Sequence, residues 1–544
     1  MRAPFHQPQP GGMGIRARRV VQMAGLLLYL WLFLATAFSG AEALGLHVGW
    51  FLRFDPLLLV ADTLARGFPA SILLWALLLV AATLVLGRFF CGWFCPLGTL
   101  LDAFSRLVPR NRRMVERPRL RNLKYYLLLA LLIPIPFSGH LVGLLDPLCL
   151  LTRTLAVVGY PGTVWIGEKL GAAYGTPLAP VTEPVYQFLR HHYLPVGDYL
   201  WTWPLFRPTL VLFLTVFGLE FLGRRFWCKY LCPLGALLSA LSVFAWLRRT
   251  PGRNCRDCGL CAPRCKAGAY DLGGRLRPNE CMLCLTCDSG CPEDRVRYRW
   301  SRPRPAKRAP DLTRRSVVFS IATGVVAGPG LGMAGLNRPG PRTLRPPGAQ
   351  AEARFLRQCA RCGACSKVCP TQGLVPTLLE TGPGGLWTPV FDFCSGYCEL
   401  GCTLCGQVCP TGAIPHLMPE VKAKTRIGLA SFDEKRCLPF AKHENCLVCE
   451  EVCPTGEKAI VFDARRIDTP EGPKDILFPR VRRDLCIGCG ICENKCPLEG
   501  DKGVITFRTE AVPPEPPPPP GVPVDVDQVR SSVGGAPYGG PYGD

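Results

Sequence analysis

Two cysteine runs between residues 255 and 291 constrain this chain more than any other feature. Both have the spacing C-x2-C-x2-C-x3-C; they are Cys255, Cys258, Cys261 and Cys265, and then Cys281, Cys284, Cys287 and Cys291. With this spacing, three thiolates wrap one 4Fe-4S cluster and the fourth binds the cluster of the other run. The predicted ligand sets are Cys255, Cys258, Cys261 and Cys291 for one cluster, and Cys281, Cys284, Cys287 and Cys265 for the other. A zinc site uses two pairs of ligands and would leave a cysteine of each run without a role.

Four further cysteine runs lie between residues 359 and 496. Two keep the full spacing, and two keep only its C-x2-C-x3-C-P end, so their first ligand must come from farther away. The runs are Cys359, Cys362, Cys365 and Cys369; Cys398, Cys402, Cys405 and Cys409; Cys437, Cys446, Cys449 and Cys453; and Cys486, Cys489, Cys492 and Cys496. Cys394 could replace Cys398, whose spacing is less distorted. The sequence thus predicts six 4Fe-4S clusters in small α+β ferredoxin-like domains, whose folding energy comes largely from cluster binding.

Residues 1–247 have the composition of a membrane domain. Hydrophobic residues make up 48% of the chain, and four apolar stretches, the first of them without a charge, predict α-helical membrane spans at about residues 20–38, 71–90, 125–145 and 208–222. The connection around residue 110 is rich in arginine, which predicts that it faces the cytoplasm. The net charge of +22 could also indicate a nucleic-acid partner. However, the basic residues concentrate beside apolar stretches and in linkers, which favours a lipid bilayer and no nucleic acid.

This membrane domain contains an internal repeat. The sequence RFFCGWFCPLGTLL at 88–101 matches RFWCKYLCPLGALL at 225–238, and DPLLLVADTLA from Asp55 matches DPLCLLTRTLA from Asp146. The copies run in the same direction, which predicts a pseudo-twofold axis along the membrane normal. The axis would bring the four C-x3-C-P cysteines to the same depth, where they could bind a metal or simply pack as small apolar side chains. These cysteines are Cys91, Cys95, Cys228 and Cys232.

Asp55 and Asp146 each precede a proline at the start of the second repeated motif. An Asp-Pro pair is typical of a helix N-cap followed by proline in the first turn. A sharper alternative is that the two carboxylates accept protons from a membrane quinol.

The segment from 301 to 350 predicts a basic linker followed by an anchor helix. Arg314 and Arg315 precede a glycine-rich, moderately apolar stretch that resembles a twin-arginine export signal. A domain that receives its clusters in the cytoplasm would have to cross the membrane already folded, so residues 351–510 are predicted to lie in the periplasm. An ordinary fifth span would have the same result, whereas a peripheral helix would keep that domain inside. The predicted domains are 1–247, 248–300, 301–350, 351–510 and a disordered tail, 511–544.

Together these motifs resemble two known families. Four spans with paired C-x3-C-P motifs and two cysteine runs resemble NapH and NosR-type membrane ferredoxins. The twin-arginine segment with four cysteine runs resembles NapG and MauM. The chain is therefore similar to a NapH–NapG fusion over about residues 15–510.

The resemblance implies a multi-pass protein of the bacterial inner membrane that acts as a quinol dehydrogenase. Electrons would pass from membrane quinol through 4Fe-4S clusters to a periplasmic reductase or cytochrome, such as a nitrate reductase system. Two other functions remain open: an assembly or redox-maintenance ferredoxin, and an electron-wiring subunit without a quinol site.

Overall fold

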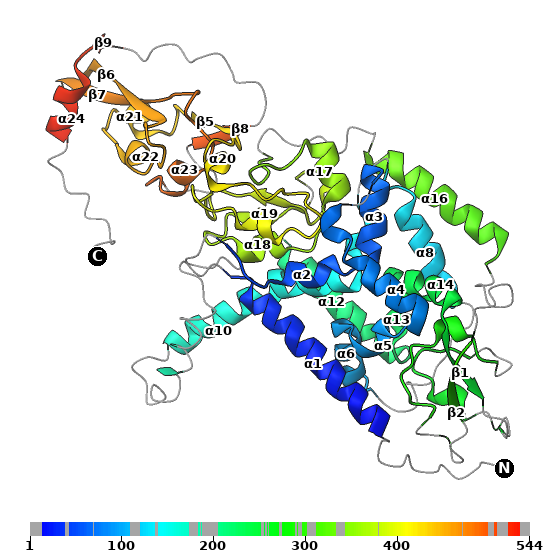
Figure 1. Cartoon of the computed structure of the whole chain (residues 1–544). Helices are drawn as coiled ribbons and strands as arrows, with labels where there is room; N and C mark the ends of the chain where they lie inside the picture. Colours follow the sequence, from blue (N-terminus) through cyan, green and yellow to red (C-terminus); the bar gives the residue numbers. More distant parts are fainter. Residues whose placement is uncertain are drawn as a thin grey trace.

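The computed structural model consists of a helical body with cysteine-rich units packed at its two ends (Figure 1). It describes residues 13–37, 43–68, 70–108, 120–136, 140–172, 183–184, 187, 205–251, 255, 258, 260–270, 275–288, 291, 296–301, 312–332, 343–378, 380–470, 472–498, 505–508 and 521–533. The arginine-rich connection at 109–119, the linker at 302–311 and parts of the predicted tail lie outside these residues.

The helical body is built from short helices. They are α1 (Met13–Ala35), α2 (Val48–Arg53), α3 (Pro56–Arg66), η1 (Ser71–Leu73), α4 (Ala76–Leu86), α5 (Phe90–Trp93), α6 (Pro96–Phe104), α8 (Leu123–Leu132), η3 (Val142–Leu144), α9 (Pro147–Thr154), η4 (Leu155–Gly159), α10 (Tyr160–Ala172), α12 (Phe206–Gly218), η5 (Leu219–Phe221), α13 (Phe226–Tyr230), α14 (Pro233–Leu241) and η6 (Ser242–Phe244). Among the described residues, only α1 is long and apolar enough to cross a membrane by itself.

The other helices are shorter than the spans that the sequence predicts. The stretch 125–145 is interrupted after α8, where Pro134 and Pro136 cannot continue a helix. The stretch 71–90 is divided into η1 and α4, and α4 ends at Gly87, whose φ of 75° belongs to the left-handed region that favours glycine. Any passage through a membrane at these helices therefore depends on the assembled body.

The internal repeat is visible in the helical body. Helices α3 and α9 begin at the repeated Asp-Pro pairs, and α5–α6 correspond to α13–α14. Asp55 Oδ1 accepts a hydrogen bond of 2.8 Å from the Leu57 amide, and Asp146 Oδ2 accepts bonds from the amides of Leu148 and Cys149. The prediction of two aspartate N-caps is confirmed. Their alternative role as proton acceptors stays a prediction.

The first cysteine-rich unit packs at one end of the body. It contains β1 (Leu247–Pro251) paired antiparallel with β2 (Val296–Trp300), together with α15 (Cys261–Arg264) and η7 (Pro278–Glu280). Trp93 Nε1 donates to the Leu283 carbonyl over 3.0 Å, and Lys266 Nζ lies 3.0 Å from Asp102 Oδ2. These contacts place the unit against the α5–α6 corner.

Helix α16 (Arg314–Gly332) runs along α8 and connects the two ends of the body (Figure 1). The Thr313 amide lies 3.2 Å from the Tyr126 hydroxyl near the start of α8. Farther along, Gly324 packs so closely on Ile133 that a Cβ on the glycine would lie 3.0 Å from the Ile133 Cβ. Both helices therefore run in the same direction. The 19 residues of α16 span about 28 Å, close to the thickness of a bilayer core.

The C-terminal unit packs at the opposite end and extends away from the body. It contains α17 (Glu352–Gln358), α18 (Ala364–Val368), β3 (Leu374–Pro376), η9 (Pro383–Gly385), β4 (Pro389–Phe391), α19 (Leu404–Val408), α20 (Pro419–Ala423), β5 (Leu429–Phe432), α21 (Leu438–Ala441), α22 (Val448–Glu451), β6 (Ile460–Thr469), β7 (Gly472–Val481), α23 (Ile491–Asn494), β8 (Ile505–Arg508), β9 (Val522–Pro523) and α24 (Val526–Val533). Its antiparallel sheets are β3–β4, β5–β8 and β7–β6–β9.

Polar contacts hold this unit on the body. The His140 amide donates to the Leu356 carbonyl over 3.0 Å, and Arg53 Nη2 donates to the Gln407 carbonyl over 3.2 Å. The predicted disorder of the whole tail is wrong for residues 521–533. There β9 pairs with β6, and Val529 of α24 is 4% exposed within a hydrophobic cluster. The valines that follow the proline-rich stretch supply the apolar surface for this packing.

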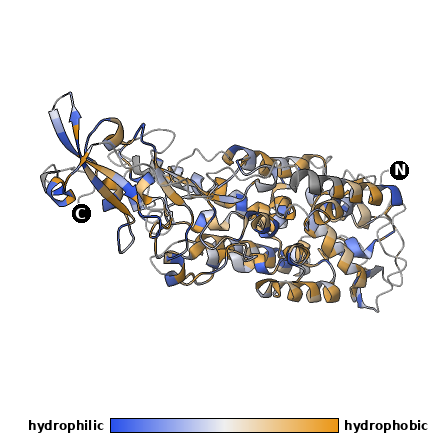
Figure 2. Cartoon of the chain, turned by 90° about the horizontal axis from the view of Figure 1, so that it is seen from above, coloured by the Kyte–Doolittle hydropathy of each residue, from blue (hydrophilic) through white to orange (hydrophobic). Residues whose placement is uncertain are grey.

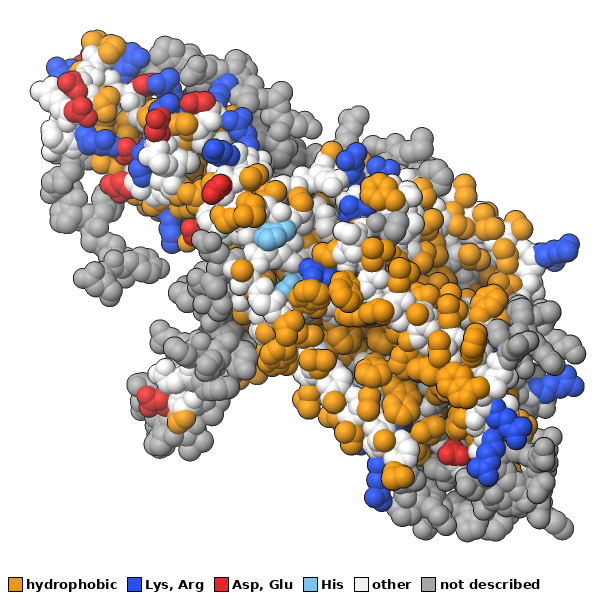
Figure 3. Space-filling view, in the orientation of Figure 1, with side chains coloured by type: hydrophobic (Ala, Val, Ile, Leu, Met, Phe, Trp, Pro, Cys, Tyr) orange, Lys and Arg blue, Asp and Glu red, His pale blue; other side chains and the backbone are white. Residues whose placement is uncertain are grey.

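Most residues of the helical body are apolar (Figure 2), and apolar side chains cover the face of the body that Figure 3 shows. Figure 3 shows a continuous apolar patch with most of the basic side chains at its margins. Large exposed members on α1, α4, α12 and α16 include Leu27, Leu28, Trp31, Leu77, Leu78, Val211, Leu214, Val318 and Phe319. A soluble monomer rarely exposes such a surface, which is typical of contact with lipid or with another protein.

Candidate iron–sulfur centres

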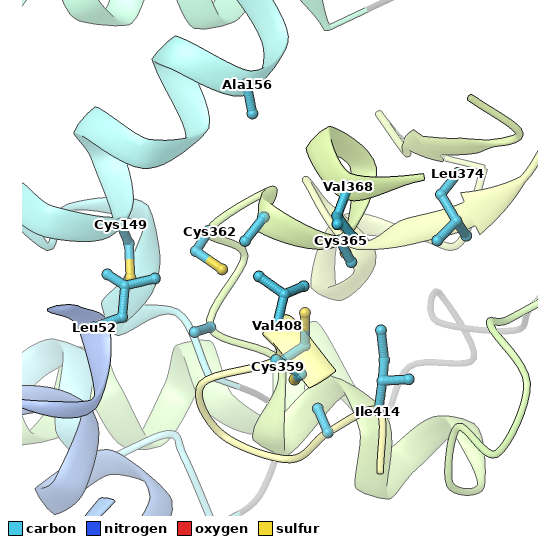
Figure 4. Packing of buried hydrophobic residues seen from close by; sticks show 14 of the residues in the cluster. Leu52, Cys149, Ala156, Cys359, Cys362, Cys365, Val368, Leu374, Val408 and Ile414 are labelled. Atoms are coloured by element: carbon cyan, nitrogen blue, oxygen red, sulfur yellow. The ribbon is translucent and has the colours of Figure 1, made fainter. Parts of the chain in front are cut away.

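The first two cysteine runs of the C-terminal unit exchange their last ligands. One pocket is lined by Cys359, Cys362, Cys365 and Cys409. Figure 4 shows the first three around one region between α18 and the segment that carries Val408 and Ile414. The second set combines Cys369 with Cys398, Cys402 and Cys405, whose thiolate charges interact with one another. This is the exchange expected of paired 4Fe-4S runs.

The last two runs show the same exchange. A pocket is lined by Cys437, Cys446, Cys449 and Cys496, with Cys492 of the neighbouring set also at its edge. In that neighbouring set, Cys453 lies within electrostatic range of Cys486, Cys489 and Cys492. The long spacing from Cys437 to Cys446 is accommodated because α21 occupies the intervening segment.

The structure distinguishes between Cys394 and Cys398. Cys398 is 7% exposed and lies beside its set, whereas Cys394 is exposed and its Sγ lies 3.8 Å from Glu493 Oε1. The geometry therefore favours Cys398 as the ligand.

The buried thiols of these sets would have to lose their protons to bind a cluster. Burial, followed by the charges of Cys446 and Cys496, raises the pKa of Cys437 to about 12. Burial also raises the pKa of Cys359 to about 11. Such thiols would stay protonated at neutral pH, so metal binding must displace their protons. Among the described residues, no three His, Cys, Asp or Glu side chains are placed to share a single metal ion. A cluster spreads its ligands around several metal atoms.

The four sets lie in a row that leads away from the helical body. Cys365 and Cys405 of the first two sets are within electrostatic range of each other. The Cys398 amide then donates to the Cys489 carbonyl over 2.8 Å, which joins the second set to the third. Cys492 in turn lies within electrostatic range of Cys449 in the last set.

A buried lysine lies at the junction of the second and third sets. Lys422 is 2% exposed, and its Nζ donates to the carbonyls of Glu399 and Leu400, the latter over 2.8 Å. Its ammonium also lies within electrostatic range of Cys398 and Cys489. The sequence analysis did not identify this residue, because nothing in the sequence around position 422 indicates proximity to the runs.

The unit at residues 255–291 shows one of its two predicted sets clearly. A pocket is lined by Cys265, Cys281, Cys284 and Cys287, as the exchange of ligands predicts. In the other predicted set, Cys255 and Cys258 are exposed, and Cys261 and Cys291 are half-buried. The structure therefore encloses the set nearer the helical body and leaves the other at the surface.

The four C-x3-C-P cysteines also gather in one place. Cys95 and Cys232 are N-caps of α6 and α14, and each sulfur accepts a bond from a glycine amide, over 3.4 and 3.2 Å respectively. Cys91 and Cys228 lie one turn earlier, and the charges of all four interact. Arg88 and Arg225, which open the repeated sequences, flank this group. Each repeated sequence begins with one of these arginines, so the repeat was the signal that could have identified Arg88 and Arg225.

Comparison with known proteins gives two kinds of match, with family models and with individual relatives. Two family models, both described as 4Fe-4S binding domains, match residues 68–114 together with 208–254, and residues 479–499. The first two segments contain only Cys91 and Cys95, and Cys228 and Cys232, as cysteines. The ferredoxin-type protein NapG of Escherichia coli is 35% identical over 158 residues, which are 29% of this chain and 67% of NapG.

Two other relatives extend this comparison. The methylamine utilization ferredoxin-type protein MauM of Methylorubrum extorquens is 35% identical over 161 residues, 29% of this chain and 69% of MauM. The protein NirI of Paracoccus denitrificans is 33% identical over 248 residues, 43% of this chain but only 30% of NirI. No solved structure matches the chain.

Proposed function

The chain belongs to the family of ferredoxin-type proteins that includes NapG and MauM, and we propose that it transfers electrons from membrane quinol to a periplasmic acceptor. Iron–sulfur electron transfer is the general function of this family. The proposal adds the quinol, the passage across a bilayer and a reductase or cytochrome as acceptor. In it, the twenty-four cysteines of the six runs hold six 4Fe-4S clusters, which supply one-electron chemistry.

The observation that carries the proposal is the placement of cysteine sets at both ends of an apolar helical body. The exposed apolar side chains on α1, α4, α12 and α16 are suited to a lipid environment. Helix α16 connects the two ends over about the thickness of a bilayer core. This arrangement supports a multi-pass inner-membrane protein with its first cysteine-rich unit in the cytoplasm and its C-terminal unit in the periplasm.

The C-terminal unit is arranged as expected for a chain of electron-transfer centres. Its four sets follow one another from the body outwards, and the Cys398–Cys489 backbone hydrogen bond fixes the spacing of the middle two. An assembly or redox-maintenance ferredoxin would have no evident use for such a row. This favours electron delivery to a partner beyond the membrane surface.

The test uses the full chain in lipid nanodiscs under anaerobic conditions. A reduced quinol should bleach the visible absorbance of the protein, dithionite should bleach it further or equally, and the oxidised quinone should have no effect. If dithionite bleaches the absorbance and quinol does not, the quinol input is refuted, and a subunit that only connects two protein partners becomes the better description.

A further inference from the structure

We propose that Cys91, Cys95, Cys228 and Cys232 together hold one additional 4Fe-4S cluster, shared between the two repeats. We call these four residues the quartet. The role of this cluster in electron transfer rests on the proposed function. The binding site itself is argued from the residues around it.

The quartet combines four sulfurs from two symmetric positions. Each of the six possible pairs lies close enough for direct charge interaction, and none of the four forms a disulfide. Cys95 and Cys232 are 7% and 5% exposed. They lie at the N-termini of nine-residue helices, where the amide donors and the helix dipole offset part of the cost of burying a thiolate.

Two buried arginines connect the repeats around the quartet. Arg225 Nη1 donates to the Cys91 carbonyl over 2.9 Å, and Arg88 Nη2 donates to the Cys228 carbonyl over 3.1 Å. Each arginine thus reaches the cysteine motif of the other repeat. Arg88 also lies against the Cys91 side chain, while its Nε has no hydrogen-bond partner although it is buried. A sulfur ligand in the quartet would satisfy that donor.

The surrounding charges favour an anionic group. The buried cations in this network are Arg18, Arg88, Lys124, Arg225 and Lys266, and the buried carboxylates are Asp102, Glu220 and Glu280. The cations therefore exceed the carboxylates by at least two among the described residues. Four thiolates around a 4Fe-4S core carry a net negative charge, which would offset this surplus, whereas four neutral thiols would leave it uncompensated.

A single zinc ion fits less well. It would draw four sulfurs to about 2.3 Å from one point, and the structure places no three ligands around one ion. A 4Fe-4S cluster binds each sulfur to a different iron atom, so its four ligands lie farther apart than those of one zinc ion. The two segments 68–114 and 208–254, which match one 4Fe-4S binding model, contain the quartet cysteines and no others.

The quartet lies directly against the enclosed ligand set of the first cysteine-rich unit. Arg225 Nη1 is 3.0 Å from Met282 Sδ, and Trp93 Nε1 donates to the Leu283 carbonyl. Met282 and Leu283 separate the predicted ligands Cys281 and Cys284. The role of the site would be one-electron exchange with that set: one site loses the electron that the other gains, and no bond or proton changes place.

The test compares full-length wild type with a Cys91→Ser/Cys228→Ser variant, which removes one ligand from each repeat. The matched controls are Cys149→Ser, a buried cysteine outside the quartet, and Cys394→Ser, an exposed one. After anaerobic purification we expect about 28 iron atoms per wild-type chain and about 24 in the double variant, with one fewer spin in the EPR spectrum of the reduced protein. Both controls should keep the wild-type values.

If the double variant does not fold, native mass spectrometry of the wild type still tests the proposal. It counts the bound clusters directly, and seven clusters are expected. Six clusters, a stoichiometric zinc ion, or quartet disulfides in the anaerobic protein would each overturn the proposal. These measurements do not depend on quinol. Loss of quinol-driven bleaching with seven clusters present would refute the proposed function and leave the site intact.

Discussion

Lys422 provides a quantitative test of the row of cluster sites. Its ammonium is buried between two predicted sets and lies within electrostatic range of Cys398 and Cys489. Reduction adds a negative charge to a cluster, so a nearby cation stabilises the reduced state and raises the reduction potential. Replacing Lys422 with methionine keeps most of the side-chain length and removes this effect.

The size of the change follows from the charge that is lost. At an effective dielectric constant of about 20, a unit charge roughly 6–10 Å from a cluster contributes about 1.7–2.8 kcal/mol, which corresponds to roughly 70–120 mV for a one-electron couple. We therefore expect Lys422→Met to lower the potential of the Cys398 set by that amount. The potential of the Cys489 set should fall by less, because the charge of Lys422 acts more weakly on Cys489 than on Cys398. The other sets should change little.

An EPR-monitored redox titration of the full chain measures these potentials. Lys424→Met is the matched control, since Lys424 is an exposed lysine only two residues away and should leave every potential unchanged. Lys422→Met also leaves the carbonyls of Glu399 and Leu400 without their donor, so the iron content of this variant must be measured in parallel. Lys422→Arg keeps the charge and should retain most of the wild-type potential. Unchanged potentials in a fully loaded Lys422→Met protein would refute the reasoning.

Three further predictions test docking, topology and export. Gly143→Ala would place a Cβ on the Ala360 carbonyl oxygen, so we expect the variant to lose about 1–3 kcal/mol of stability at the interface with the C-terminal unit, seen as a lower unfolding midpoint; an unchanged midpoint would contradict the docking. The exposed Cys394 should react with a membrane-impermeant maleimide in intact spheroplasts, and Cys394→Ser should abolish that labelling. Labelling only after permeabilisation would place the unit in the cytoplasm. Replacing Arg314 and Arg315 with lysine should trap a reporter fused after residue 510 inside the cell, and normal export would exclude a twin-arginine route.

The cysteine spacing was informative because it acts locally. Each C-x2-C-x2-C turn brings three sulfurs together within one short segment, and the longer gap carries the fourth outwards, as the Cys359 and Cys409 positions illustrate. The aspartate caps were predictable for the same reason, since Asp55 bonds to an amide only two residues ahead. In both features the interacting residues lie within a few positions of one another, so the sequence pattern alone predicts them.

Features that depend on distant contacts were not predictable in this way. Apolar composition indicated membrane helices, but Pro134 and the assembled body determine where α8 ends. The contact of Arg53 with Gln407 joins positions far apart in the chain, so no local pattern encodes where the C-terminal unit docks. Val529 was assigned to a disordered tail because the neighbouring prolines and glycines dominate the composition there.

The two repeats differ in the source of the carboxylate that pairs with their equivalent arginine, and for one of them it comes from outside the repeat. Arg225 of the second copy pairs with Asp102 of the first, over 3.0 Å, but the position equivalent to Asp102 in the second copy is Ser239. Arg88 of the first copy therefore lacks a carboxylate from its partner repeat, and Glu280 of the first cysteine-rich unit supplies one over 2.8 Å. Breaking a buried ion pair of this kind typically costs about 3–5 kcal/mol. The first cysteine-rich unit is thus part of the repeat's own buried charge network, which explains why its enclosed ligand set lies against the C-x3-C-P motifs.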